Sequence, residues 1–335
     1  MPVALCAMSH SPLMGTNDPE PLVVAEVDAA FEHARSFIRD FDPELVVIFA
    51  PDHYNGVFYD MLPPFCIGSA ATSVGDYGTQ AGPLDVDRDA AWDIARAVLA
   101  SGVDIAVSER MHVDHGFAQA LELLTGSITA IPTVPVFVNS VGEPMTPVSR
   151  IRLLGDAVGK AVAGMDRRVL LVGSGGLSHD PPVPQFFGAS PEVQARLIDG
   201  RNPTAEQRSA REQRVIDAGR DFAAGVSTMQ PLNPKWDNHL LEVLASGDLT
   251  PIDSWTNDWF VQQAGHSSHE VRTWIAAYAA LAANGAYTVE STYYRPILEW
   301  IAGFGITTAL PVTNAKAATR RYQHSALDLK AVEPS

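Results

Sequence analysis

Three apolar runs of the sequence each end on a histidine. "LCAMSHSPL" contains His10, "VVIFAPDH" ends on His53, and "LLVGSGGLSH" ends on His179. A fourth histidine, His115, lies in "HVDHGF", directly before a helical pattern. Imidazole is the commonest metal ligand and the commonest general acid or base, because its pKa lies near neutrality. Four histidines in equivalent places therefore indicate a metal site or an acid–base site.

The elements that must position these histidines alternate between strands and helices. Expected buried strands cover 3–8, 44–50, 104–108, 131–138 and 168–174, and expected helices between them cover 19–41, 86–102 and 148–165. This alternation predicts an α/β fold, a central mixed or mostly parallel sheet flanked by helices on both faces. Ligands of open α/β sheets bind beyond the carboxyl ends of the strands. We therefore expect the four histidines to converge there.

Beyond residue 180 the pattern becomes mainly helical, with expected helices at 204–224, 237–246 and 270–284. We predict a single domain over residues 1–312. Residues 313–335 have little apolar periodicity, and we expect them to form a flexible tail or a contact with another subunit.

A metal site also needs a carboxylate, and the sequence offers three candidates. Glu270 opens an amphipathic helical pattern, but Ser267-x-x-Glu270 fits a capping box, so spacing alone favours helix capping over metal ligation. Asp52 and Asp114 each stand directly before a histidine. Either could be a metal ligand or an acceptor that fixes the tautomer of an imidazole.

Two histidines and one carboxylate leave open positions on a metal. Non-haem Fe(II) enzymes use such a set to bind substrate and O₂, and hydrolytic zinc enzymes use a similar one. The sequence has no HExxH helix, "GSGGL" is not followed by GK[ST], and the G-x-S-x-G spacing is absent. These absences weigh against a zinc-protease helix, a phosphate loop and a nucleophile elbow.

Composition narrows the class of protein further. The formal charge of −16 disfavours nucleic acid and anionic membrane surfaces as partners. Cys6 and Cys66 both stand in apolar surroundings, and we expect two buried thiols rather than a disulfide. The first residues do not resemble a signal peptide, and no apolar run reaches the roughly 18–20 residues of a membrane span. We therefore expect a cytoplasmic protein.

Several longer segments carry a family resemblance. "SHSPL", "APDHYNG", "VDHGFAQ", "GSGGLSHDPPVP", "PLNPKWDN" and "YYRPILEWIAGFG" resemble the class III extradiol ring-cleaving dioxygenases, the superfamily of the protocatechuate 4,5-dioxygenase beta subunit. The resemblance covers about residues 1–305. It implies an oxidoreductase of aromatic catabolism that incorporates both atoms of O₂ into a catechol, here 2,3-dihydroxyphenylpropionate or 2,3-dihydroxycinnamate. It also implies a homo-oligomer.

The resemblance implies roles for individual residues as well. Fe(II) would be held by His10, His53 and Glu270, with His115 as proton donor and His179 as proton acceptor. Arg295, in "YYRP", is a candidate to bind the carboxylate of the substrate. Two alternatives stay open, namely a dioxygenase for another 3-substituted catechol and a zinc-dependent hydrolase on the same scaffold.

Overall fold

The computed structural model describes residues 2–312, and its centre is an eight-stranded sheet with the order β10-β11-β1-β9-β2-β8-β3-β6. The strands are β1 (Val3–Met8), β2 (Leu45–Ala50), β3 (Phe65–Gly68), β6 (Ala106–Ser108), β8 (Thr133–Val138), β9 (Val169–Ser174), β10 (Tyr287–Ile297) and β11 (Ala302–Pro311). The four inner strands β1, β9, β2 and β8 are parallel. β11 pairs with β1 antiparallel, and β3 pairs with β8 antiparallel, so the sheet is mixed.

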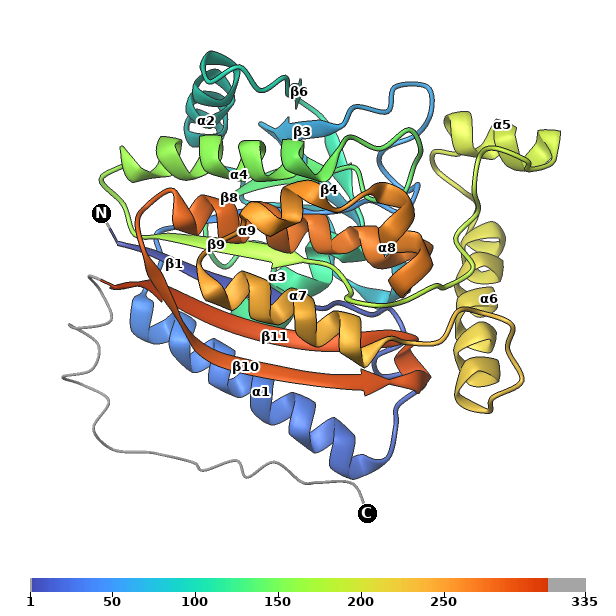
Figure 1. Ribbon diagram of the computed structural model, residues 1–335. Coiled ribbons are helices and arrows are strands. Elements are labelled where there is room, and N and C mark those ends of the chain that lie inside the picture. Colours follow the sequence, from blue (N-terminus) through green and yellow to red (C-terminus); the bar gives the residue numbers. More distant parts are fainter. Residues whose placement is uncertain (1, 313–335) are drawn as a thin grey trace.

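The inner strands are buried along their whole length, as their continuous apolar sequences require. Side chains alternate between two cores. In β1, for example, Val3 and Leu5 face one core, whereas Ala4 and Cys6 face the other. Helices α2 (Arg88–Ala100), α4 (Val148–Ala163) and α9 (Val271–Ala282) cover the first face, and α1 (Pro21–Phe41) and α3 (His115–Thr125) cover the second (Figure 1). The predicted α/β class is confirmed.

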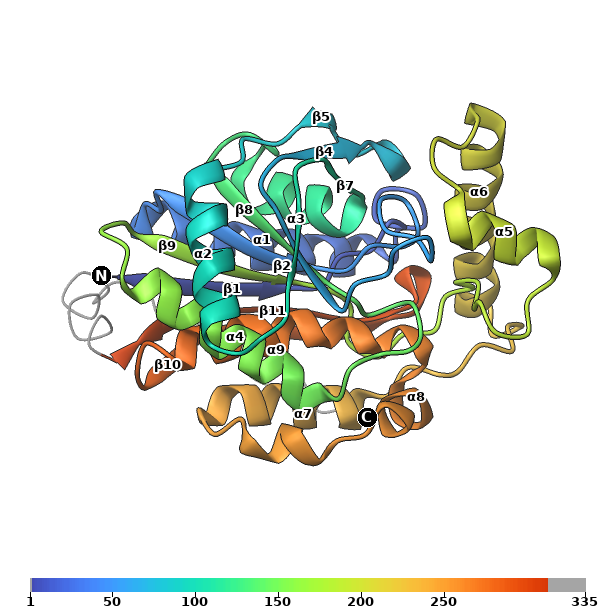
Figure 2. The same cartoon turned by 90° about the horizontal axis from the view of Figure 1, so that it is seen from above.

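The C-terminal part is rich in helices, as predicted, and adds α5 (Pro191–Asp199), α6 (Ala205–Ala223), α7 (Pro234–Ser246) and α8 (Asn257–Ala264). Figures 1 and 2 both place α5 and α6 to one side of the sheet, beyond the carboxyl ends of the central strands. The long hairpin of β10 and β11 was not expected from the sequence. β10 lies at the sheet edge, and most of its residues are half-exposed, such as Arg295, or exposed, such as Pro296, so they do not form an apolar run.

A second, three-stranded sheet with the order β5-β4-β7 also escaped prediction. It consists of β4 (Ala71–Val74), β5 (Ala81–Pro83) and β7 (Met111–Val113). A 3-10 turn, Asp76–Gly78, connects β4 to β5, and Tyr77 adopts a positive φ of 48° there. This turn matters because it carries the buried carboxylate of Asp76 into the neighbourhood of α3.

Three further predictions concern single features of the chain. Cys6 and Cys66 are buried and not disulfide-bonded, as expected. Among the helices within residues 2–312, none is both long enough and apolar enough to cross a membrane. The predicted tail, 313–335, lies outside the described residues.

Candidate metal and catalytic site

The carboxyl ends of the strands bring four histidines to one cavity. His10 follows β1, His53 follows β2 and His179 follows β9, while His115 is the first residue of α3, just after β7. All four line a cavity of about 1010 Å³, including the part open to solvent. The ring centroids of His10 and His53 lie 5.6 Å apart, those of His10 and His115 5.4 Å, and those of His53 and His115 4.5 Å.

Glu270 is the carboxylate that faces these imidazoles. Its Oε1 atom lies 2.9 Å from Nε2 of His53 and 3.1 Å from Nε2 of His179, and its Oε2 atom lies 3.4 Å from Nε2 of His10. The backbone N–H of Gly176 donates to Oε2 at 2.9 Å. The side chain is only 2% exposed. The carboxylate of Glu270 therefore contacts three of the four histidines through their Nε2 atoms.

The capping-box interpretation of Glu270 is wrong. A 3-10 turn, His266–Glu270, precedes α9, and neither this turn nor α9 has a side-chain capping hydrogen bond at its N-terminus. The backbone begins the helix at this position, but the side chain points into the cavity instead of back to its own helix. Spacing could not show this, because a capping glutamate and a buried ligand open a helix with the same residue types.

Two glycines of "GSGGLSH" allow this close packing. A Cβ atom at Gly175 would lie 2.8 Å from Cβ of Glu270 and 2.6 Å from its carbonyl oxygen. A Cβ atom at Gly176 would lie 2.7 Å from the ring of His179. Real Cβ atoms do not come this close to such neighbours, so the glycines of this loop make room for Glu270 and His179.

A hydrogen bond at Nδ1 fixes the orientation of His10 and of His179. Nδ1 of His10 lies 2.9 Å from Oγ of Ser174, whose hydroxyl donates to the carbonyl of Gly116 at 2.6 Å, so Oγ accepts the Nδ1 proton. Nδ1 of His179 donates to the carbonyl of Leu177 at 3.0 Å. When either ring is neutral, its proton is therefore at Nδ1 and Nε2 presents a lone pair to Glu270. Burial opposes the charged form of His179, but Glu270 outweighs it and raises the pKa of this ring.

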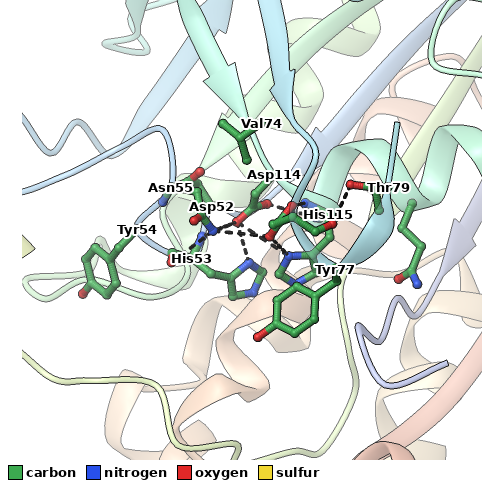
Figure 3. A network of polar contacts seen from close by, with 12 residues as sticks. Asp52, His53, Tyr54, Asn55, Val74, Tyr77, Thr79, Asp114 and His115 are labelled. Atoms are coloured by element: carbon green, nitrogen blue, oxygen red, sulfur yellow. Dashed lines mark hydrogen bonds and ion pairs between the residues drawn. The ribbon is translucent and has the colours of Figure 1, made fainter. Parts of the chain in front are cut away.

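Carboxylates hold the other two imidazoles in the same way. Nδ1 of His53 lies 3.0 Å from Oδ2 of Asp114, and Nδ1 of His115 lies 2.6 Å from Oδ2 of Asp76. Each carboxylate also accepts the backbone N–H of its histidine at 2.8 Å. Figure 3 shows the rings of His53 and His115 side by side, with Asp114 close to both. Both aspartates therefore contact the Nδ1 side of their ring, and the Nε2 atoms take no part in these hydrogen bonds.

The two aspartates that precede histidines thus differ in their roles. Asp114 is the tautomer-fixing acceptor, one of the two alternatives that the sequence left open. Asp52 instead accepts backbone N–H bonds from Asn55, Gly56 and Val57, and so closes the turn after His53. Sequence reasoning missed Asp76, because it lies 39 residues before His115 and belongs to the unpredicted small sheet.

The electrostatics of the cluster favour a cation at its centre. Burial lowers the pKa of His10 to about 3, so this imidazole is neutral at physiological pH. Burial opposes the charged form of Glu270, but His179 and His10 outweigh it and hold the pKa of that carboxyl well below its usual range. Glu270 in turn raises the pKa of His53 and of His179, so protons on these two rings balance the buried carboxylate where no cation is bound. A divalent cation at the same point could replace those protons.

The donor set fits a transition-metal ion. One ligand atom from each of His10, His53 and His115 lies within 4.8 Å of the others, and Glu270 adds an oxygen beside His10 and His53. Burial opposes the charged form of His53, but Asp114 and Glu270 raise its pKa well above the usual value. A metal would compete for that site with the proton, since only neutral imidazole is a ligand.

The remaining residues considered from the sequence lie away from this cluster. His266 is exposed and bonds to Asp180, and His269 is buried against Phe260, so neither histidine of the Glu270 turn reaches the imidazoles. Arg295 lies on β10, where its guanidinium donates to Glu26 at 2.6 Å, and it is not among the described residues that line the cavity.

Comparison with known proteins agrees with this site. Residues 4–305 match the family described as the catalytic LigB subunit of aromatic ring-opening dioxygenase. The chain belongs to this family. The match to the LigB family extends from β1 into β11 and includes the four histidines of the cavity and Glu270.

Relatives within the LigB family are similar along nearly their whole length. A 2,3-dihydroxyphenylpropionate/2,3-dihydroxicinnamic acid 1,2-dioxygenase from Rhodococcus sp is 76% identical over 312 residues, 93% of this chain and 99% of the relative. A protein of the same name from Rhodococcus jostii (strain RHA1) is 74% identical with the same coverage. Another from Burkholderia vietnamiensis is 59% identical over 91% of this chain and 96% of the relative.

Proposed function

We propose that this chain is an Fe(II)-dependent extradiol dioxygenase that opens the ring of 2,3-dihydroxyphenylpropionate and 2,3-dihydroxycinnamate. The observation that carries the proposal is the convergence of four Nδ1-anchored imidazoles around a buried carboxylate in one cavity. The names of the relatives, the first of them 76% identical, support the substrate.

In this proposal His10, His53 and Glu270 hold the iron. They provide two neutral nitrogens and one charged oxygen, and they come from separate strand ends and from the start of α9. Bound Fe(II) would supply the activation of O₂ and a binding position for the two catechol oxygens. Ser174 and Asp114 keep the Nε2 atoms of the two histidines directed at that position.

The proton-transfer roles of His115 and His179 follow from the groups that each imidazole contacts. Nδ1 of His115 faces the carboxylate of Asp76, which stabilises a protonated ring and suits a proton donor. Nδ1 of His179 faces the neutral carbonyl of Leu177, and the charge that raises the pKa of this ring is Glu270, 3.1 Å from Nε2. With that carboxylate bound to iron, His179 would become a neutral ring that suits a base for a catechol hydroxyl. We therefore assign His115 as proton donor and His179 as proton acceptor.

The direct test is oxygen uptake by reduced, iron-loaded protein mixed with 2,3-dihydroxyphenylpropionate. We expect one O₂ to be consumed for each catechol, together with a yellow ring-opened product that forms only in air. Protein loaded with zinc is the matched control and should give no product. A product that forms without oxygen would favour a zinc-dependent hydrolase. Turnover only with other 3-substituted catechols would keep the reaction class and change the substrate.

Replacement of Asp76 tests the donor role of His115 through pH. Burial opposes the charged form of His115, but Asp76 and Asp114 outweigh it and raise its pKa. In Asp76→Asn the ring should lose its proton at lower pH, so the alkaline limb of kcat/KM should move to lower pH. The rate at the optimum should fall roughly 10- to 100-fold.

The matched control for this test is Asp93→Asn, which removes an exposed carboxylate on α2 that pairs with Arg96. Its pH profile should coincide with that of the wild type. An Asp76→Asn profile with an unmoved alkaline limb would contradict the assignment of His115 as the donor.

A further inference from the structure

One side of the cavity is unusually rich in arginine. Arg196 on α5 and Arg208, Arg211 and Arg214 on α6 all line the cavity that holds the four histidines. We call these four residues the arginine cluster. The chain as a whole has 39 acidic and 23 basic residues, so this concentration of positive charge runs against its composition. Both helices lie beyond the carboxyl ends of the central strands (Figure 2).

The arginine cluster has no anionic partner in the part of the chain that the structure describes. Other arginines nearby do pair, since Arg201 bonds to Asp60 at 2.7 Å and Arg220, also on α6, bonds to Asp217 at 3.3 Å. In contrast, the guanidinium groups of Arg196 and Arg214 make neither a hydrogen bond nor an ion pair with any residue within 2–312.

The other two members of the cluster bond only to neutral groups. Arg208 donates to the carbonyl of Val74 at 3.2 Å. Nη2 of Arg211 lies 3.4 Å from the carbonyl oxygen of Tyr54 and 3.5 Å from that of His53. The carboxylate of Glu212 also lines the cavity, but its Oε1 accepts the backbone N–H of Tyr77 at 2.9 Å.

Like charges held together without an anion destabilise one another. Burial, together with the charges of Arg211 and Arg214, lowers the pKa of Arg196. A carboxylate from outside the chain would relieve this repulsion, because guanidinium binds carboxylate through paired, charge-assisted hydrogen bonds. The cluster is therefore suited to an anionic group of a ligand.

The arginine cluster lies close to the proposed metal site, so an anionic group bound by it could belong to a ligand of that site. Arg211 contacts the backbone of His53 and Tyr54, so the cluster begins immediately beside one of the histidines at the proposed iron. A catechol bound at that position through its two oxygens would carry its side chain on the neighbouring ring carbon, within reach of the same cavity. The apolar residues Pro181, Pro184 and Ile301 line the same cavity and suit a hydrocarbon chain.

We propose that Arg196, Arg211 and Arg214 bind the carboxylate of the substrate's three-carbon side chain and so select carboxylated catechols over uncharged ones. This inference rests on the proposed ring-cleaving function. It assigns the binding of the substrate carboxylate to arginines on α5 and α6. Arg295, the candidate from the sequence, is already paired with Glu26.

The first experiment compares two substrates, 2,3-dihydroxyphenylpropionate and 3-propylcatechol, which differ mainly in the carboxylate. The measured quantity is the ratio of their kcat/KM values with iron-loaded enzyme. In Arg196→Gln, Arg211→Gln and Arg214→Gln we expect this ratio to fall about 10- to 100-fold, because each variant loses charged hydrogen bonds. The loss should appear mainly as a higher KM for the carboxylated substrate. For the Lys variants at the same positions, the ratio should lie between that of the wild type and that of the Gln variants.

The second experiment needs no turnover. Binding of 3-phenylpropionate, which has the carboxylate but no hydroxyl groups, is measured by calorimetry on metal-free protein, with 3-phenylpropanol as the uncharged comparison. The Gln variants should weaken binding of the acid about 10-fold or more. Arg220→Gln is the matched control, because Arg220 also lies on α6 but is paired with Asp217, and it should change neither experiment.

The outcomes separate this inference from the proposed function. A substrate ratio and an acid affinity within about twofold of wild type in all three Gln variants would overturn the inference, even if ring cleavage proceeds. Failure of the wild type to cleave either catechol would instead overturn the proposed function. Where a Gln variant does not fold, judged by circular dichroism, the Lys variant at that position decides the result.

Discussion

Glu270→Gln is expected to leave the protein folded but with a much weaker affinity for the proposed iron. The carboxylate is buried and lies within 3.4 Å of the Nε2 atoms of His10, His53 and His179. An amide removes the negative charge that would balance a divalent cation. It also risks placing an N–H₂ group against the backbone N–H of Gly176, which now donates to Oε2. We expect metal affinity and turnover each to fall at least about 100-fold.

The measurement is iron content after anaerobic loading and desalting, together with the rate of oxygen uptake. Glu242→Gln, an equivalent change on the exposed face of α7, is the matched control and should bind a full complement of iron. Circular dichroism should show the same secondary structure for both variants. Full iron content in Glu270→Gln would remove Glu270 from the ligand set.

The gathering of the histidines could be predicted because it depends on strong signals. Runs such as "LVVIFA" are apolar throughout, which indicates inner strands of a parallel sheet, and parallel strands bring their carboxyl ends to one edge. The residues that follow those strands, His10, His53 and His179, therefore had to lie near one another. Their sequence separation was irrelevant to this conclusion.

The rest of the site depends on contacts that leave no local pattern. Glu270 and a capping glutamate look alike in sequence, and only the family resemblance separated them. Asp76 is placed by a 3-10 turn between two short strands whose own residues are partly exposed. Arg211 and Arg214 stand on a helix of low mean hydropathy, and a charged helix is normally read as a solvated surface. The tertiary packing of the elements decides what these side chains face, and the periodicity of the sequence does not reveal it.

The division of labour among the histidines is tested by comparing three alanine variants. We expect His53→Ala to lose the iron, because one of the proposed ligands is missing. His115→Ala and His179→Ala should keep the iron and lose turnover by roughly 10²–10⁴, the usual contribution of a general acid or base. Iron content and the rate of oxygen uptake, measured on the same preparations, separate the two kinds of loss.

Among the three histidines, His115 is the one whose position would also allow it to be a metal ligand. Its ligand atom lies within 4.8 Å of those of His10 and His53, so distance alone would allow it as a third nitrogen ligand. The pKa is raised at both His115 and His53, so it does not separate the two rings. The opposing argument is the position of Glu270, whose oxygens lie 3.4 Å and 2.9 Å from Nε2 of His10 and His53, whereas the carboxylates that pair with His115 are Asp76 and Asp114. Loss of iron from His115→Ala would refute the donor role. Retention of iron, with a rate restored in part by added imidazole, would place the proton transfer at this ring.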